Sequence, residues 1–130
     1  MSKARDAHHA RRAAVAALGK SISRRASSRC ELCDGNKDLR VHEVPPAEDI
    51  PHEDAAILAC ELCRHDMDGK RLGDLERLRC LETAIWSEVA PVQIAAVRLL
   101  RRVAAEVDWA QRVLDGHWLD DEMAARVEAS

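Results

Sequence analysis

The sequence contains no phenylalanine and no tyrosine, and three tryptophans are its only aromatic residues. A core without those rings must be built from leucine, valine, isoleucine and alanine, a composition that favours packed helices. Apolar residues make up 47% of the 130 residues, which is enough for one domain with a real core. No apolar run approaches the roughly 20 residues needed to cross a bilayer, and no signal peptide is evident. We therefore expect a cytoplasmic protein with no membrane association.

Acidic residues are almost absent from the beginning of the sequence. Residues 1–29 carry eight Lys or Arg and one Asp, a net charge of +7, whereas the remainder carries −10 and the whole chain −3. A basic arm of this kind could contact nucleic acid, dock on the acidic body or remain solvated. Nucleic acid is therefore a candidate partner, through the basic residues Arg11, Arg12, Lys20, Arg24 and Arg25.

The most informative motif is a pair of identical tetrapeptides. Cys30-Glu31-Leu32-Cys33 is followed, after twenty-six residues, by Cys60-Glu61-Leu62-Cys63. Each C-x-x-C turn can place two sulfurs on one side of the chain, and two such pairs complete the tetrahedral shell that Zn²⁺ prefers. Four soft thiolates favour zinc or iron over magnesium or calcium. The sequence therefore predicts one structural zinc ion, bound by Cys30, Cys33, Cys60 and Cys63.

Disulfide bonds, an iron–sulfur cluster and redox-active thiols are the alternatives to a zinc site. Four cysteines allow three disulfide pairings, but cytosolic thiols stay reduced, and an iron–sulfur cluster would use the same four ligands. Cys80 lies in an apolar helical pattern, so we expect a buried thiol outside the metal site. Glu31 and Glu61, inside the two motifs, are expected to point to solvent.

Hydrophobic spacing predicts a helix before the first cysteine motif. Apolar residues recur at intervals of three and four between residues 8 and 27, with a kink or break expected at Gly19. Residues 1–7 are expected to be disordered. The apolar stripe formed by Val15, Leu18 and Ile22 is expected to pack on the helical body, meaning the helices predicted after the second cysteine motif.

A short β-hairpin is predicted between the two motifs. One strand runs from about Leu39 to Val44 and is ended by Pro45-Pro46, and a second spans residues 56–59. Helices are predicted from about residue 75 to 86, from Pro91 onward, over residues 108–115 and from Asp120 or Asp121 onward.

These elements give an α+β fold that is mostly α. A four-cysteine zinc ribbon, built on the short β-hairpin, has a helix before it and a helical layer after it. We divide the chain into a basic N-terminal helix (1–29), a zinc-ribbon module (30–68) and a helical C-terminal region (69–130).

Several motifs in this order resemble the PhnA family, the proteobacterial alkylphosphonate-utilisation operon proteins with a zinc-ribbon N-terminus. The match extends from about residue 18 to 126. Its motifs are Ser28-Arg29-Cys30-Glu31-Leu32-Cys33, Val41-His42-Glu43-Val44-Pro45-Pro46, Cys60-Glu61-Leu62-Cys63, Arg79-Cys80-Leu81-Glu82, Ile85-Trp86-Ser87-Glu88-Val89, Pro91-Val92-Gln93 and Leu119-Asp120-Asp121-Glu122. The resemblance implies a small zinc-binding protein, and the molecular activity of that family is not established. Activities that depend on the C-terminal β domain of longer members are not carried over.

The order of cysteine pair, strand with histidine and proline, and second cysteine pair also resembles HNH (His-Me finger) nucleases, more weakly. Those enzymes bind a catalytic metal and use a histidine as general base. By position, His42 matches the first metal ligand, Glu43 the base and His65 roughly the second ligand. The fit is poor, because Glu43 replaces the imidazole base and Asn36, the sole asparagine, lies on the wrong side of the strand.

We therefore expect a non-enzymatic zinc protein that acts through protein contacts. The alternatives are a nucleic-acid-binding zinc protein that uses the basic helix and a degenerate relative of the HNH nucleases. A homo-oligomer is compatible with the sequence.

Overall fold

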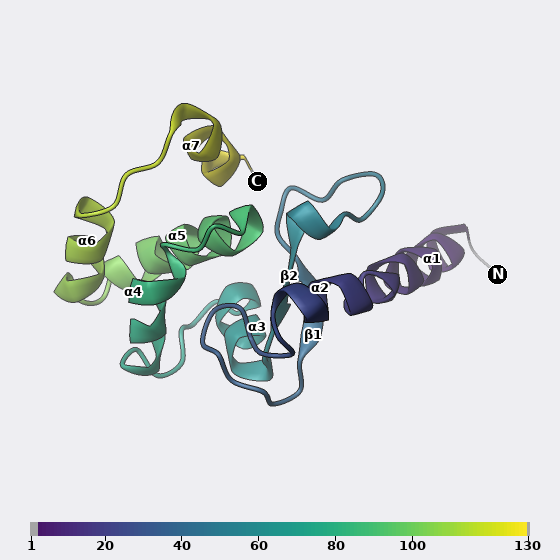
Figure 1. Ribbon diagram of the computed structural model, residues 1–130, viewed down its shortest axis with the longest axis horizontal. Helices are drawn as coiled ribbons and strands as arrows, with labels where there is room; N and C mark the ends of the chain where they lie inside the picture. Colours follow the sequence, from purple (N-terminus) through teal and green to yellow (C-terminus); the bar gives the residue numbers. More distant parts are fainter. Residues whose placement is uncertain (1–2, 130) are drawn as a thin grey trace.

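A computed structural model describes residues 3–129 of the chain, and its arrangement is seen in Figure 1. It confirms the expected α+β, mostly α, fold with a two-stranded hairpin and a four-cysteine cluster. Every helix among these residues is too short or too polar to cross a lipid bilayer. In chain order the elements are α1 (Lys3–Ala17), α2 (Gly19–Arg25), β1 (Arg40–Glu43), the 3₁₀ helix η1 (Glu53–Ala55), β2 (Ala56–Ala59), α3 (Glu61–Asp68), the 3₁₀ helix η2 (Arg77–Cys80), α4 (Leu81–Ala84), α5 (Ala90–Ala104), α6 (Asp108–Asp115) and α7 (Asp121–Glu128).

Strand β2 contributes side chains to both apolar cores of the molecule. It pairs with β1 in antiparallel register, with His42 opposite Ile57, and all four of its residues are buried. Because side chains alternate between the faces of a strand, Ile57 and Ala59 join the main core while Ala56 and Leu58 join a second, smaller one. The hairpin is therefore covered on both faces, which compensates for its shortness.

Helix α5 is the centre of the main core. Pro91 lies in its first turn, where a missing N–H is harmless, and nine of its fifteen residues are buried, so it is enclosed on most of its circumference. Figure 1 shows α4 and α6 beside it, and α7 contacts it through Arg98 and Arg101. The apolar cluster around α5 also contains Cys30, Cys60 and Cys63. The cysteine site is thus part of the main core.

The N-terminal helix is longer than the sequence indicated, and it is broken in two. Helix α1 begins at Lys3, so the expectation of disorder is wrong for residues 3–7, while residues 1 and 2 lie outside the described part. Ala4, Arg5 and Ala7 are strong helix formers, and an apolar-stripe criterion does not detect them. The chain breaks between α1 and α2 at Leu18, next to the predicted break at Gly19.

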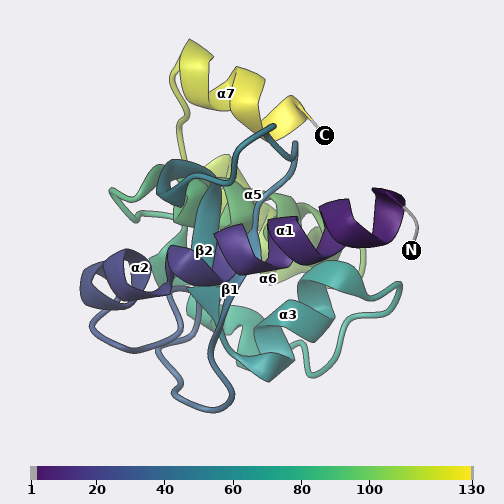
Figure 2. The ribbon, with the colours of Figure 1, turned by 90° about the vertical axis from the view of Figure 1, so that its right-hand side faces the viewer.

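The packing of this helix differs from the prediction. Ile22, fully buried, contacts Ala56 and Leu58 on the face of the hairpin that points away from α5. Leu18 packs beside it, whereas α1 has no buried residue. Figure 2 shows α1 crossing the two strands, with α5 farther from the viewer. Leu18 and Ile22 therefore pack on the ribbon instead of the helical body, because β2 presents a second apolar face, while Val15 stays partly exposed.

The predicted helix over residues 75–86 is divided into η2 and α4. Helix α6 spans Asp108–Asp115 as expected, although Val107, not Asp108, occupies its N-cap position. Asp120 caps α7 by accepting a hydrogen bond from the Met123 N–H at 2.8 Å.

Two arginines of α5 donate hydrogen bonds to the C-terminal ends of helices α3 and α7. Arg102 donates to the carbonyls of Asp66 and Gly69, the latter at 2.7 Å, at the end of α3. Arg98 donates to the carbonyls of Arg126 (2.8 Å) and Val127 (3.0 Å) in α7. A cation at the C-terminal end of a helix is favourable because the last carbonyls have no partner within the helix.

Candidate metal centre

The first cysteine pair lies in a tight turn after α2. The Cys30 N–H donates to the Gly35 carbonyl at 2.7 Å, and the Asp34 N–H donates to the Cys30 carbonyl at 2.8 Å. Asp34 has a left-handed backbone with φ of 66°. The Gly35 N–H points at the Cys33 sulfur, 3.4 Å away, and a Cβ on Gly35 would approach that sulfur to 3.2 Å. A glycine at this position therefore lets the backbone reach the sulfur.

The second cysteine pair lies where β2 runs into α3. Cys60 is the N-cap residue of α3, and Cys63 lies in its first turn. The Arg64 N–H donates to the Cys60 carbonyl at 2.9 Å. The N-terminus of α3 therefore directs the partial positive charge of the helix toward this cysteine pair.

The fold brings the four cysteines of the predicted zinc site together. The sulfurs of Cys30, Cys33, Cys60 and Cys63 all lie within 4.8 Å of one another, and those of Cys33 and Cys60 are 3.5 Å apart. Tetrahedral zinc with Zn–S bonds of about 2.3 Å requires sulfurs about 3.8 Å apart. The donor set therefore fits a tetrahedral metal ion such as zinc, and a four-sulfur shell leaves no position open for water or substrate.

The electrostatics of this cluster also favour a cation. A hydrogen bond from Cys63 lowers the pKa of Cys30 to about 4, whereas burial raises the pKa of Cys33 to about 12. The hydrogen bond to Cys30, together with burial, raises the pKa of Cys63 as well. These three thiols therefore ionise unequally because of their hydrogen bonds and burial, and neighbouring thiolates also repel one another. A divalent cation removes that conflict and allows all four to ionise.

A charged pair lies beside the cluster. The Arg77 guanidinium donates to the Cys63 sulfur at 3.4 Å and also to the Asp66 carboxylate. The Asp66 side chain is 2% exposed, and it accepts a second hydrogen bond from the Gly73 N–H at 2.8 Å. Although burial opposes its charge, the hydrogen bond to Cys63 and the charges of Cys63 and Asp66 raise the pKa of Arg77. Arg77 is therefore held as a cation against a sulfur of the four-cysteine cluster.

Sequence reasoning missed this pair, since Arg77 is eleven residues from Asp66 and fourteen from Cys63, and no spacing rule connects them. One signal was present. Asp66 follows Cys63 by three residues on a helix, so both lie on the same face, and an acid on the ligand-bearing face needs a cationic partner.

Cys80 lies outside the four-sulfur group, as expected. It is partly buried in the main cluster, and burial raises the pKa of its thiol to about 11. A thiol with such a pKa stays protonated and inert at neutral pH.

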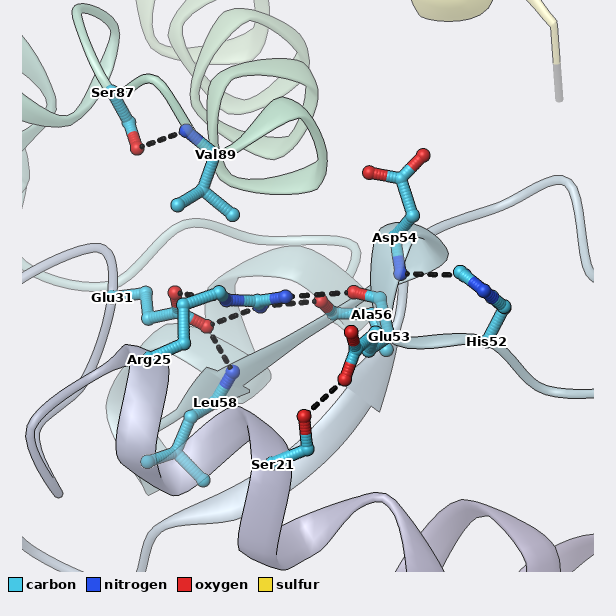
Figure 3. A network of polar contacts seen from close by, with 10 residues as sticks. All are labelled: Ser21, Arg25, Glu31, His52, Glu53, Asp54, Ala56, Leu58, Ser87 and Val89. Atoms are coloured by element: carbon cyan, nitrogen blue, oxygen red, sulfur yellow. Dashed lines mark hydrogen bonds and ion pairs between the residues drawn. The ribbon is translucent and has the colours of Figure 1, made fainter.

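The two glutamates inside the cysteine motifs have different environments. Glu61 is exposed, as expected, but the Glu31 side chain is only 6% exposed, so the expectation of solvent contact was wrong for Glu31. Arg25 donates to both of its oxygens, at 2.7 and 3.0 Å, and the Leu58 N–H donates to Oε1 at 2.9 Å (Figure 3). The Glu31 N–H in turn donates to the Leu58 carbonyl at 2.9 Å. Glu31 therefore satisfies the edge of β2 that does not pair with β1.

This contrast gives a matched pair of variants. Glu31→Ala should lower the free energy of unfolding by about 1.5–3 kcal/mol, because it removes charge-assisted hydrogen bonds and leaves the Leu58 N–H without its partner. Glu61→Ala, the same change at the same motif position, should alter it by less than about 0.5 kcal/mol. Urea denaturation of the zinc-loaded variants measures both values. Equal effects of the two substitutions would mean that Glu31 does not hold the first cysteine motif to strand β2.

The residues that match the HNH pattern are engaged in other contacts. The His42 Nε2 lies 3.3 Å from the Asp68 carboxylate. Arg11 grips both oxygens of Glu43, at 2.6 and 3.1 Å. His65 is exposed on α3. Within residues 3–129, the four-cysteine group is the single cluster of three or more metal-binding side chains with such close ligand atoms, and it does not include His42, Glu43 or His65.

The five basic residues proposed to contact nucleic acid divide into two groups. Arg11 and Arg25 have internal roles, the first on Glu43 and the second on Glu31 and the Ala56 carbonyl. Arg12, Lys20 and Arg24 are exposed.

Comparison of the chain with protein-family profiles, curated proteins and solved structures finds no match.

Proposed function

We propose that this chain is a PhnA-like small zinc protein that is non-enzymatic and acts in the cytoplasm through contacts with another protein. The observation that carries the proposal is the convergence of the four cysteine sulfurs within 4.8 Å inside the main core. Such a site holds the hairpin, α3 and the turn of the first cysteine motif in one arrangement, and it offers no coordination position for a substrate. The protein surface that the bound metal stabilises would then make the contact with the partner protein.

Zinc is favoured by the chemistry of the donor set. Four thiolates suit zinc or an iron–sulfur cluster, and a single tetrahedral ion fits sulfurs as close as the 3.5 Å between Cys33 and Cys60. Zinc has no redox chemistry, so it would keep the cluster in one state under reducing conditions. Homo-oligomerisation remains compatible with the proposal.

The contacts of the HNH-like residues also support a non-enzymatic role. A general base must be free to accept a proton near the working pH. Glu43 would first have to break its two-pronged ion pair with Arg11. His42 faces the Asp68 carboxylate, an arrangement that a second metal ion would have to reorganise.

Two measurements test the proposal. Affinity capture from native lysate, with nuclease treatment, mass spectrometry and sequencing of any nucleic acid, should yield a specific protein partner. Incubation of plasmid DNA with the protein and Mg²⁺, Mn²⁺ or Ni²⁺ should give no cleavage. Cleavage by the wild-type protein that disappears in a His42→Ala variant, with its zinc retained, would establish a metal-dependent nuclease instead.

Nucleic-acid binding is the second candidate function. It is favoured by the exposure of Arg12, Lys20 and Arg24 on the N-terminal helices. Lys20 and Arg24 also line a shallow surface depression at α2. If this candidate is right, the logarithm of the binding constant for DNA or RNA should fall linearly with the logarithm of salt concentration. Binding that does not depend on salt, or none at all, would exclude it.

A further inference from the structure

A groove of about 930 Å³ lies between α1, strand β1 and α5, near the end of α3. Its lining includes the partly exposed apolar residues Val15, Val41 and Met67, which lie beside the buried Leu58 and Leu99. Figure 2 shows α1 running across the strands at this side of the molecule. Helix α1, which contributes Val15 to this lining, is fifteen residues long and has no buried residue. The groove is thus an apolar trough with one wall formed by a lightly packed helix.

The rim of the groove is positively charged. Five arginines line it, Arg11, Arg12, Arg40, Arg98 and Arg102, against two carboxylates, Glu43 and Asp68. Both carboxylates already face a partner within the groove, Arg11 at 2.6 Å and His42 at 3.3 Å.

The charges of several of these arginines remain uncompensated by a carboxylate. The hydrogen bonds of Arg98 and Arg102 go to backbone carbonyls, which satisfy N–H groups without cancelling the charge. Arg12 is exposed and has no ion-pair partner among the described residues. The groove therefore favours a ligand that carries negative charge along its edges.

An apolar floor with a basic rim matches a ligand that has an apolar face and acidic flanks. A nucleic-acid backbone has no such apolar face, and a single strand binds through bases stacked on aromatic rings. No tryptophan lines the groove, and the chain has no phenylalanine or tyrosine. An amphipathic helix with apolar residues at i, i+3, i+4 and i+7 fits a groove of this kind.

We propose that this groove binds an acidic amphipathic α-helix of a partner protein. The inference rests on the proposed function, because it names the surface and the chemistry of the protein contact. The partner helix would lay its apolar stripe on Val15, Val41 and Met67, which are partly exposed, and direct its carboxylates toward Arg12.

The probe is a synthetic helical peptide of about 18 residues, five turns, with leucine on one stripe and glutamate elsewhere. A scrambled peptide of the same composition and a DNA duplex are the comparison ligands. Fluorescence anisotropy should show binding of the helical peptide that weakens with added salt, and binding of the scrambled peptide at least about tenfold weaker. Failure of the helical peptide to bind, or equal binding of the scrambled one, would overturn the proposal.

Two matched pairs of variants locate the binding site. Ala16→Glu places a carboxylate in the groove, whereas Ala17→Glu places it on the same helix outside the groove. Arg12→Glu and Arg24→Glu change the net charge equally, but Arg24 lies in the separate depression at α2. The groove variants should weaken peptide binding about tenfold or more, and the controls by less than about twofold.

Circular dichroism and zinc content confirm that each variant is folded. Equal losses within a pair would show that net charge, not the groove, binds the peptide, and would overturn the inference. Binding of the DNA duplex in preference to the peptide would overturn the inference, and its loss in Arg24→Glu would assign the depression at α2 to nucleic acid. A natural protein partner whose binding is unaffected by Arg12→Glu and Ala16→Glu would leave the proposed function standing and refute the groove alone.

Discussion

Replacing Cys63 with serine should abolish metal binding and unfold the ribbon. The Cys63 side chain is fully buried among the other three ligands, and the two strands of the hairpin have four residues each. A hairpin of that length is marginal alone, whereas zinc binding to a structural site is worth about 10–16 kcal/mol at neutral pH. We expect one zinc ion per wild-type chain, no zinc in the variant, and rapid amide exchange throughout β1 and β2 of the variant.

Cys80→Ser is the matched control, since Cys80 is partly buried in the same apolar cluster but lies outside the sulfur group. It should retain one zinc ion and the slow amide exchange of the hairpin. Elemental analysis of reduced protein gives the metal content and also identifies the metal. Loss of zinc in Cys80→Ser, or reduced wild-type protein without metal, would contradict the assignment of the four ligands.

The parts of the fold that follow from local chemistry were predictable. The C-x-x-C spacing constrains two sulfurs within one turn, and the hairpin, the helix start at Pro91 and the cap at Asp120 each depend on neighbouring residues. The convergence of the two cysteine pairs was predictable because tetrahedral coordination requires it.

Features that depend on residues far apart in the sequence were not predictable in the same way. Glu31 and Glu61 occupy the same position in identical tetrapeptides, yet one is clamped by Arg25 and the other is exposed. The difference comes from the proximity of α2 and β2 to the first motif, and neither tetrapeptide carries that information.

The docking of the N-terminal helix shows the same limit. An apolar stripe reveals that Ile22 must be buried, but it does not reveal against which surface. Two apolar faces were available, the helical body and the outer face of the hairpin, and Ala56 and Leu58 provide the second. Likewise, the ion pair between Arg11 and Glu43 joins residues 32 positions apart, so a motif centred on His42 does not indicate that Glu43 is engaged.

The second large effect is expected at Asp66. Removal of its carboxylate in Asp66→Ala leaves Arg77 without its counter-ion beside the metal site and the Gly73 N–H without its acceptor. Breaking a buried ion pair by removing one partner costs about 3–5 kcal/mol, and because the Arg77 side chain is 22% exposed we expect the lower end of that range. Urea denaturation should show a loss of this size. Asp68→Ala on the same helix removes an exposed carboxylate that faces His42 and should cost less than about 1 kcal/mol.

A double variant separates the structural role of this pair from its role at the metal. In Asp66→Ala, Arg77→Met no buried charge is left unpaired, so much of the lost unfolding free energy should return. Zinc affinity should behave differently, because the Cys63 sulfur has lost the Arg77 N–H donor that lies 3.4 Å away. Removing such an outer contact lowers metal affinity about 10–100-fold, and competition with a chromophoric chelator measures it. If stability and zinc affinity recover together in the double variant, Arg77 has no role at the metal and serves only to neutralise Asp66.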